Sequence, residues 1–159
     1  MDALLDLLKE NARESNANLA KQLGRSQEDV ESQISKLQNE GIIRAFKAII
    51  NEDKLSSNDV HAVIELRIQP QHDGGFDSIA KRIGQFDEVE SLFLMSGGYD
   101  LLLFIKGSTL QTVAGFVSTR LSTIEGVLST ATYFMLKTYK DQGVLMESDN
   151  DDKRLPICP

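Results

Sequence analysis

Apolar residues recur at helical spacing in three short segments at the start of the chain, residues 1–12, 16–23 and 27–39. In the third segment, Val30, Ile34 and Leu37 form one apolar stripe. Gly24 and Ser26 are suited to close the second helix and cap the third. Residues 42–50 are rich in β-forming residues and predict a wing with its exit strand. Together these elements predict a winged helix-turn-helix over residues 1–52.

A polar connector over residues 51–59 is the expected domain boundary. Beyond it, period-two alternation predicts a strand that Pro70 ends, and helical spacing follows over residues 76–83. The later elements are two strands joined by a glycine-rich turn, a helix and a last strand, at residues 88–95, 99–106, 110–121 and 127–138. This β-α-β-β-α-β order predicts a ferredoxin-like domain over residues 59–140, so the fold class is α+β.

Both faces of the predicted sheet are apolar. Leu101, Leu103 and Ile105 alternate with Leu102 and Phe104 along one strand. Two helices cover only one face, and a second copy of the domain is the simplest cover for the other. We therefore expect a homodimer and a higher even-numbered oligomer. Residues 141–159 are expected to form an acidic tail.

Composition narrows the class of protein. The chain has 159 residues, 41% of them hydrophobic, and no apolar run approaches the roughly 20 residues that span a bilayer. A single cysteine, Cys158, supports neither a disulfide framework nor a metal cluster, and His61 and His72 lack ligand-like neighbours. We expect a cytoplasmic protein with no membrane partner, no metal site and no cofactor.

The negative charge of the first domain argues against strong DNA binding by its helix-turn-helix. The net charge is −7, and residues 1–53 hold seven Lys/Arg against ten Asp/Glu. DNA affinity comes largely from neutralised phosphates, so a basic footprint is the usual finding. Either oligomerisation multiplies weak contacts, or DNA binding is poor. The second case would describe a ligand sensor or oligomeric partner protein with a degenerate helix-turn-helix.

The glycine-rich turn, Ser96-Gly97-Gly98-Tyr99-Asp100, is the strongest candidate for binding a small molecule. Its backbone N–H groups can bind a carboxylate and Asp100 an ammonium, which together suit an amino acid. The alternative is an ordinary hairpin turn. Thr130 and Thr132 share a face of the last strand, where hydroxyls can line a pocket, although spacing alone favours ordinary strand residues.

The chain resembles the Lrp/AsnC, or feast/famine, family of regulators over nearly its whole length. The matching motifs are Asn11-Ala12-Arg13, Leu19-Ala20, Gly24 with Ser26, Leu37, Glu40-Gly41-Ile42-Ile43, Ser96-Gly97-Gly98-Tyr99-Asp100, Gly126-Val127 and Thr130-x-Thr132. The resemblance implies a transcriptional regulator that binds double-stranded DNA, and a C-terminal ferredoxin-like (RAM) domain that dimerises, assembles further and binds a small effector, often an amino acid.

The resemblance also implies site residues. DNA-binding positions are Arg13, Arg25, Ser26, Gln27, Gln33, Ser35 and Lys36. Effector-binding positions are Ser96, Gly97, Gly98, Tyr99, Asp100, Thr130 and Thr132. Family members commonly carry arginines where this chain has Gln33 and Ser35.

An enzymatic alternative is disfavoured. Tetrapyrrole decarboxylases resemble the same two-module architecture but use histidine and basic residues around the hairpin, where this chain has Gly97-Gly98. We therefore expect no enzyme and no catalytic residue.

Overall fold

The computed structural model describes residues 2–55, 59–69 and 75–147. Contacts divide the chain into two compact units, Met1–Ile50 and Asn51–Pro159. The predicted strand end at Pro70, together with His72 and Cys158, lies outside the described residues. Within them, no helix is long and apolar enough to cross a membrane.

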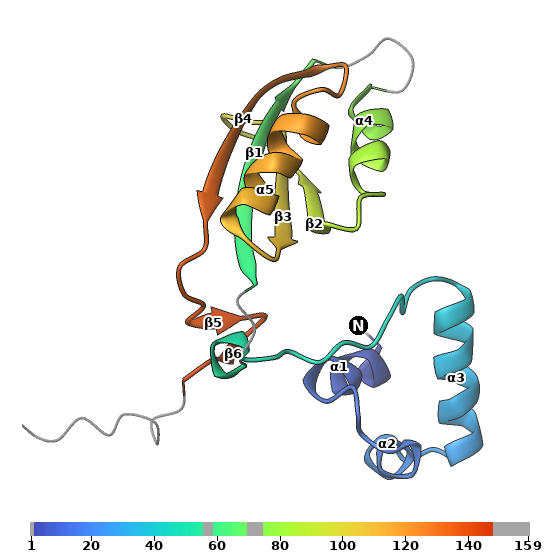
Figure 1. Ribbon diagram of the computed structural model, residues 1–159. Helices are drawn as coiled ribbons and strands as arrows, with labels where there is room; N and C mark the ends of the chain where they lie inside the picture. Colours follow the sequence, from blue (N-terminus) through green and yellow to red (C-terminus); the bar gives the residue numbers. More distant parts are fainter. Residues whose placement is uncertain (1, 56–58, 70–74, 148–159) are drawn as a thin grey trace, which may run out of the picture. The chain divides into compact units, whose positions relative to one another are not determined.

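The first unit consists of helices α1 (Ala3–Glu10), α2 (Asn16–Leu23) and α3 (Gln27–Asn39) (Figure 1). Polar side chains cap all three, because Asp2, Ser15 and Ser26 each accept a backbone N–H of the first turn. Gly24 ends α2 in the left-handed region, with φ of 64°. The buried apolar residues of the three helices form one core, made of Leu4, Leu8, Leu19, Ala20, Val30 and Leu37.

Helices α2 and α3 have the predicted bounds, whereas α1 is shorter than predicted. Its cap at Asp2 fixes the start, and Asn11 adopts an extended conformation after Glu10. The expected strand over residues 42–50 is not formed: Arg44–Ile50 carries no regular secondary structure. A β-strand requires a partner, and within the described residues no strand pairs with this segment.

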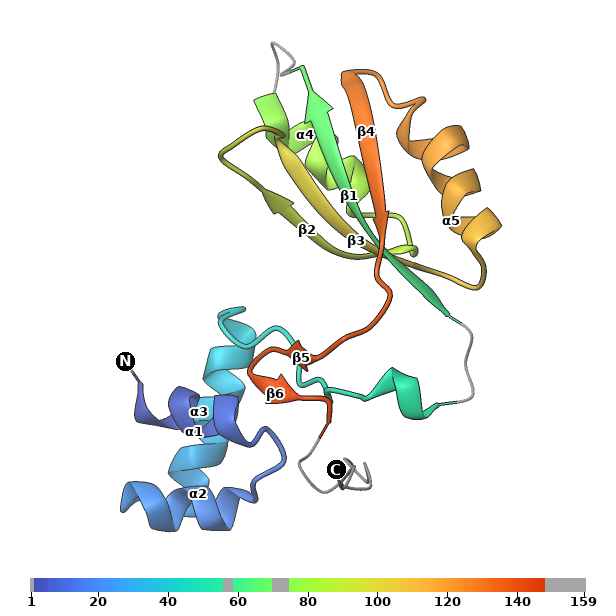
Figure 2. The same ribbon diagram turned by 90° about the vertical axis from the view of Figure 1, so that its left-hand side faces the viewer.

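The second unit contains a four-stranded antiparallel sheet with two helices on one face (Figures 1 and 2). The elements follow the chain in the order β1 (Val60–Ile68), α4 (Gly75–Ile83), β2 (Val89–Leu94), β3 (Leu101–Gly107), α5 (Leu110–Phe116) with a π turn at Val117–Leu121, and β4 (Val127–Phe134). The strand order is β2-β3-β1-β4. This confirms the predicted ferredoxin-like fold.

Strand β4 ends four residues earlier than predicted, close to where its antiparallel partner β1 begins at Val60. Phe134 pairs with Ala62, and the Met135 N–H donates to the His61 carbonyl at 2.9 Å. A hairpin of β5 (Lys140–Asp141) and β6 (Val144–Leu145) follows. This hairpin occupies the first residues of the segment predicted as a tail, residues 141–159, so that part of the prediction is wrong. The cause is a two-residue turn at Gln142-Gly143 with φ of 43° and 93°.

Alternation divides the sheet into a helix-covered face and an open face. The covered face buries residues of β1 and β3, namely Ala62, Ile64, Leu66, Ile68, Leu101, Leu103 and Ile105. On the open face Leu102 and Phe104 are half-buried, and Phe93 packs edge-on against Phe104 with ring centroids 6.1 Å apart. Phe93 is still 50% exposed and Tyr133 54% exposed. The sheet therefore presents an apolar surface that neither α4 nor α5, the helices described in this unit, covers.

Candidate functional site

The polar side of α3 is the first candidate. Its cap residue, Ser26, accepts the Asp29 N–H through Oγ at 3.1 Å, so that hydroxyl already satisfies the helix backbone. Val30 and Leu37 point into the core, and Ser35 and Lys36 are exposed. An exposed polar helix following a tight turn is the arrangement with which helix-turn-helix proteins reach base edges.

The predicted DNA-binding residues of α3 do not share one face. Gln27 donates to Glu31 Oε1 at 2.8 Å, and Asn16 of α2 donates to the same oxygen at 3.3 Å. These two hydrogen bonds, that of Gln27 first, hold the pKa of Glu31 below its ordinary value. Gln27 therefore lies on the α2 flank of α3, beside a carboxylate that stays ionised.

Gln33 lies on the opposite flank, next to the start of α1. Its side-chain nitrogen donates to Asp2 Oδ2 at 2.5 Å, and its side-chain oxygen accepts a hydrogen bond from Arg25. A hollow of about 360 Å³ beside this flank is lined by Asp2, Asp29, Ser32, Gln33, Lys36, Leu37 and Glu40.

Arg13, another predicted DNA-binding residue, lies in the turn after α1. Its backbone N–H donates to Asn11 Oδ1 at 3.1 Å.

The loop between β2 and β3 is tied to the end of β1. The Asp100 N–H donates to the Leu66 carbonyl at 2.9 Å, and Asp100 Oδ2 accepts the Ile68 N–H at 2.8 Å. Arg67 Nε donates to the Gly98 carbonyl at 2.8 Å. Asp100, whose carboxylate was predicted to bind the ammonium of a ligand, therefore uses one carboxylate oxygen in a hydrogen bond to the backbone.

A pocket of about 230 Å³ opens beside this loop. Its lining comes from β1, the loop and β4, namely Glu65, Arg67, Gly98, Tyr99, Ser129, Thr130 and Ala131. Of the predicted effector residues, Gly98, Tyr99 and Thr130 are brought together here. Ser96, Gly97, Asp100 and Thr132 are not part of the lining.

Strand register explains why Glu65 and Arg67 line the pocket, although the sequence did not predict them as effector-binding residues. Arg67 lies opposite Ser129 and Glu65 opposite Ala131, on the open face, whereas Thr130 and Thr132 lie opposite the buried Leu66 and Ile64. The available signal was the alternation of β1, in which Glu65 and Arg67 occupy the outward positions. A carboxylate and a guanidinium in one small pocket are complementary to a ligand that carries both charges.

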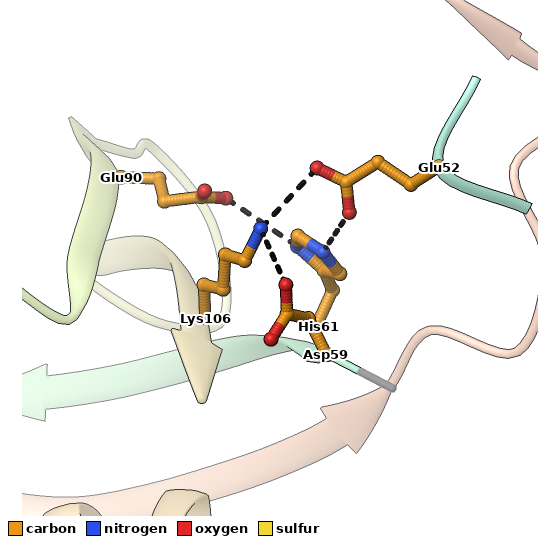
Figure 3. Close-up of polar contacts among 5 residues, drawn as sticks. All are labelled: Glu52, Asp59, His61, Glu90 and Lys106. Carbon is orange, nitrogen blue, oxygen red and sulfur yellow. Dashed lines mark hydrogen bonds and ion pairs between the residues drawn. The ribbon is translucent and has the colours of Figure 1, made fainter. Parts of the chain in front are cut away.

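A charged cluster joins the connector to the far end of the sheet (Figure 3). Glu52, in a short 3-10 helix (Glu52–Lys54), places Oε2 at 2.6 Å from His61 Nε2 and Oε1 at 3.4 Å from Lys106 Nζ. Asp59 lies 3.0 Å from Lys106 Nζ, and Glu90 lies 3.4 Å from His61 Nδ1. Asp59 first, then Glu52, raises the pKa of Lys106. The described residues contain no group of three or more side chains suited to a metal ion.

Comparison with known proteins identifies the family. Residues 61–145 match the Lrp/AsnC ligand-binding domain, and residues 3–44 match a winged helix-turn-helix DNA-binding domain. The chain belongs to the Lrp/AsnC family. It is a transcriptional regulator with a helix-turn-helix and an Lrp/AsnC ligand-binding domain.

Similar transcriptional regulators cover 87% to 98% of the chain. The uncharacterized HTH-type transcriptional regulator YugG of Bacillus subtilis is 41% identical over 98% of this chain and 95% of its own. The proline dehydrogenase transcriptional activator of Rhizobium radiobacter is 24% identical, covering 89% and 90%. A Neisseria meningitidis transcriptional regulator, solved as its L-Met complex, superposes with a TM-score of 0.68 at 25% identity, covering 87% and 88%.

Proposed function

We propose that this Lrp/AsnC regulator binds a free amino acid in the pocket beside the β2–β3 loop, and that occupancy changes its affinity for DNA. The observation that carries the proposal is that Glu65 and Arg67 both line one pocket of about 230 Å³. Pockets for drug-sized ligands usually measure about 300–1,000 Å³, so this one suits a smaller molecule. The Neisseria meningitidis relative in complex with L-Met supports the same ligand class.

The charges give the ligand an orientation. Arg67 uses Nε on the Gly98 carbonyl, and its two terminal nitrogens are the donors for a ligand carboxylate. Glu65 then accepts from the ammonium, with Tyr133 Oη 3.4 Å from Glu65 Oε2 at the edge of the site. The loop backbone at Gly98 and Tyr99 closes the pocket. In this assignment Asp100 shapes the loop.

A homodimer completes the proposed mechanism. We assign the open sheet face to contact with a second copy, because Leu102, Phe104, Phe93 and Tyr133 form an apolar surface next to the pocket strand. Residues 1–52 would form the DNA-binding domain and residues 59–140 the effector-binding and oligomerisation domain. A dimer places two α3 helices on two half-sites, and an effector that prefers one state of the assembly shifts DNA affinity by that preference.

A thermal-shift screen against the standard amino acids tests the ligand. A ligand that binds only the folded state at a hundred times its Kd adds about 2.7 kcal/mol to stability. We expect one amino acid or a chemically related few to raise the melting temperature. Arg67→Ala should remove the shift, and the exposed Arg82→Ala on α4 is the matched control that should keep it. A shift that survives in Arg67→Ala would refute the site.

Gel shifts with DNA from the regulator's own upstream region test DNA binding. We expect binding that weakens steeply as salt rises, because phosphate contacts release counterions. A folded protein that binds no DNA at any salt concentration would favour the alternative of a sensor without DNA affinity. In that case, replacing Gln33 and Ser35 with arginine should create binding.

Native mass measurement tests the dimer with a matched pair of substitutions. Phe93 on the open face and Leu110 at the start of α5 are 50% and 51% exposed. Phe93→Glu should yield a monomer, whereas Leu110→Glu should keep the assembly of the unmodified protein. Equal assemblies for both variants would contradict the open-face interface.

A further inference from the structure

The start of α1 is linked to α3 by one carboxylate with two tasks. Asp2 Oδ1 accepts the Leu4 N–H at 3.1 Å and caps α1. Asp2 Oδ2 accepts the side-chain N–H of Gln33 at 2.5 Å, across 31 positions of sequence. Asp2 precedes α1 and lies outside the segment made of α2, its turn and α3.

The same link determines which way the Gln33 amide points. Its oxygen accepts from the Arg25 guanidinium, and its nitrogen donates to the Asp2 carboxylate. The reversed orientation would place the amide N–H groups against a cation and the amide oxygen against an anion. The two charged neighbours therefore fix one orientation of the amide.

An amide held in this way keeps part of its hydrogen-bonding capacity for a ligand. A glutamine side chain has two N–H donors and two oxygen lone pairs, and Asp2 and Arg25 each use one. One donor and one acceptor are left, which is the combination that pairs with N7 and the N6 amino group of adenine in the major groove. Gln33 is only half-buried and lines the hollow beside α3 with the exposed Lys36 and Ser32.

We propose that Asp2 is a positioning residue for DNA recognition, which orients Gln33 so that α3 prefers adenine at one base pair of each half-site. This inference rests on the proposed function, because it requires that α3 enters the major groove. Asp2 touches no base in this scheme; it acts through Gln33. A good bidentate contact of this kind discriminates against the wrong base by roughly ten-fold or more.

Asparagine at position 2 separates the two tasks of Asp2. Asn caps helices about as well as Asp, so α1 keeps its cap. While the Asn Oδ1 holds the Leu4 N–H, however, the NH2 group that replaces Oδ2 can only donate and cannot accept from Gln33. Asp2→Asn therefore removes the acceptor for Gln33, and Asp2→Ser does the same with a different cap residue. Asp29→Asn is the matched control, because Asp29 lines the same hollow and the variant makes the same change in charge.

The experiment is selection of bound DNA by the full-length protein from a duplex pool with a randomised central region, followed by sequencing. The unmodified protein should enrich a motif with adenine at one base pair per half-site, and Gln33→Ala should lose that preference. Asp2→Asn and Asp2→Ser should lose most of it, while the other positions of the motif persist. Asp29→Asn should retain it. Thermal unfolding followed by helical circular dichroism should be similar for all the Asp2 and Asp29 variants.

Distinct results separate the two levels of the argument. The positioning role of Asp2 is wrong if Asp2→Asn and Asp2→Ser keep the adenine preference that Gln33→Ala loses. It is also wrong if Asp29→Asn loses that preference as much as the Asp2 variants do. In both cases the proposed binding of DNA bases by α3 is retained. If Gln33→Ala changes no base preference, the proposal is also wrong. If the unmodified protein enriches no motif, the proposed DNA-binding function fails and takes this inference with it.

Discussion

Replacing Asp100 with alanine tests whether its carboxylate holds the β2–β3 loop. Asp100 Oδ2 accepts the Ile68 N–H at 2.8 Å, and this contact is partly buried. Alanine removes this side-chain acceptor. The backbone of residue 100 can still accept from the Met95 N–H and donate to the Leu66 carbonyl. The variant therefore isolates one hydrogen bond between a backbone donor and a charged acceptor.

The magnitude follows from that single contact. A hydrogen bond to a charged group contributes about 1.5–3 kcal/mol to stability. The site is only partly buried, and water can replace some of the lost contact, so we expect a loss of about 1–2 kcal/mol for Asp100→Ala. For a unit of this size, each kcal/mol lowers the melting temperature by about 4–8 °C. Asp100→Asn keeps an acceptor and should lose roughly half as much, because a neutral hydrogen bond is about half as strong.

Tyrosine signals make the assay specific to the second unit. The chain has no tryptophan and three tyrosines, Tyr99, Tyr133 and Tyr139, all of which lie after Asn51. Near-ultraviolet circular dichroism of tyrosine therefore follows unfolding of this unit alone. Protein concentration must be equal for all variants, because assembly couples concentration to the melting temperature. An Asp100→Ala variant that melts with the unmodified protein would refute the structural role of the carboxylate.

Two further predictions concern close packing and acid stability. A Cβ at Gly107 would lie 2.9 Å from Val113 Cγ2, so Gly107→Ala should destabilise the second unit by about 1–3 kcal/mol. A Cβ at Gly115 would meet no atom within 4 Å, so Gly115→Ala should stabilise α5 by up to about 1 kcal/mol. Equal free energies of unfolding for the two variants in denaturant would contradict this packing. The Asn18 side chain, followed by the Ser15 N–H, lowers the pKa of Glu14 below its ordinary 4.5, so its contribution is present above that pH and is lost as the pH falls through the lowered pKa. Glu14→Gln should then flatten the acid side of the stability profile measured by helical circular dichroism, and an unchanged profile would show that Glu14 contributes nothing.

Local signals explain why much of the fold could be predicted. Ser26 and Gly41 bracket α3, and strict alternation defines β1, so the bounds of these elements follow from neighbours in the chain. The hairpin at Gln142-Gly143 had a local signal too, in its turn residues, although the acidic composition that follows directed the interpretation toward a tail. The open apolar face was likewise readable from the two-sided pattern of β3.

Pairing between distant segments decided the candidate sites. Glu65 and Arg67 enter the pocket only because the β1–β4 register sets them opposite Ala131 and Ser129, and a shift of one residue would turn them to the other face. The same register turned Thr132 toward the helices.

The sequence by itself therefore determined the three helices of the first unit and the order of strands and helices in the ferredoxin-like domain, because caps and periodicity act over a few residues. Only the tertiary structure decided which side chains meet. It joined Asp2 to Gln33, and it left Arg44–Ile50 without a strand partner among the described residues. Hydrogen bonds between distant segments depend on how the backbones pack, and no local pattern encodes that packing.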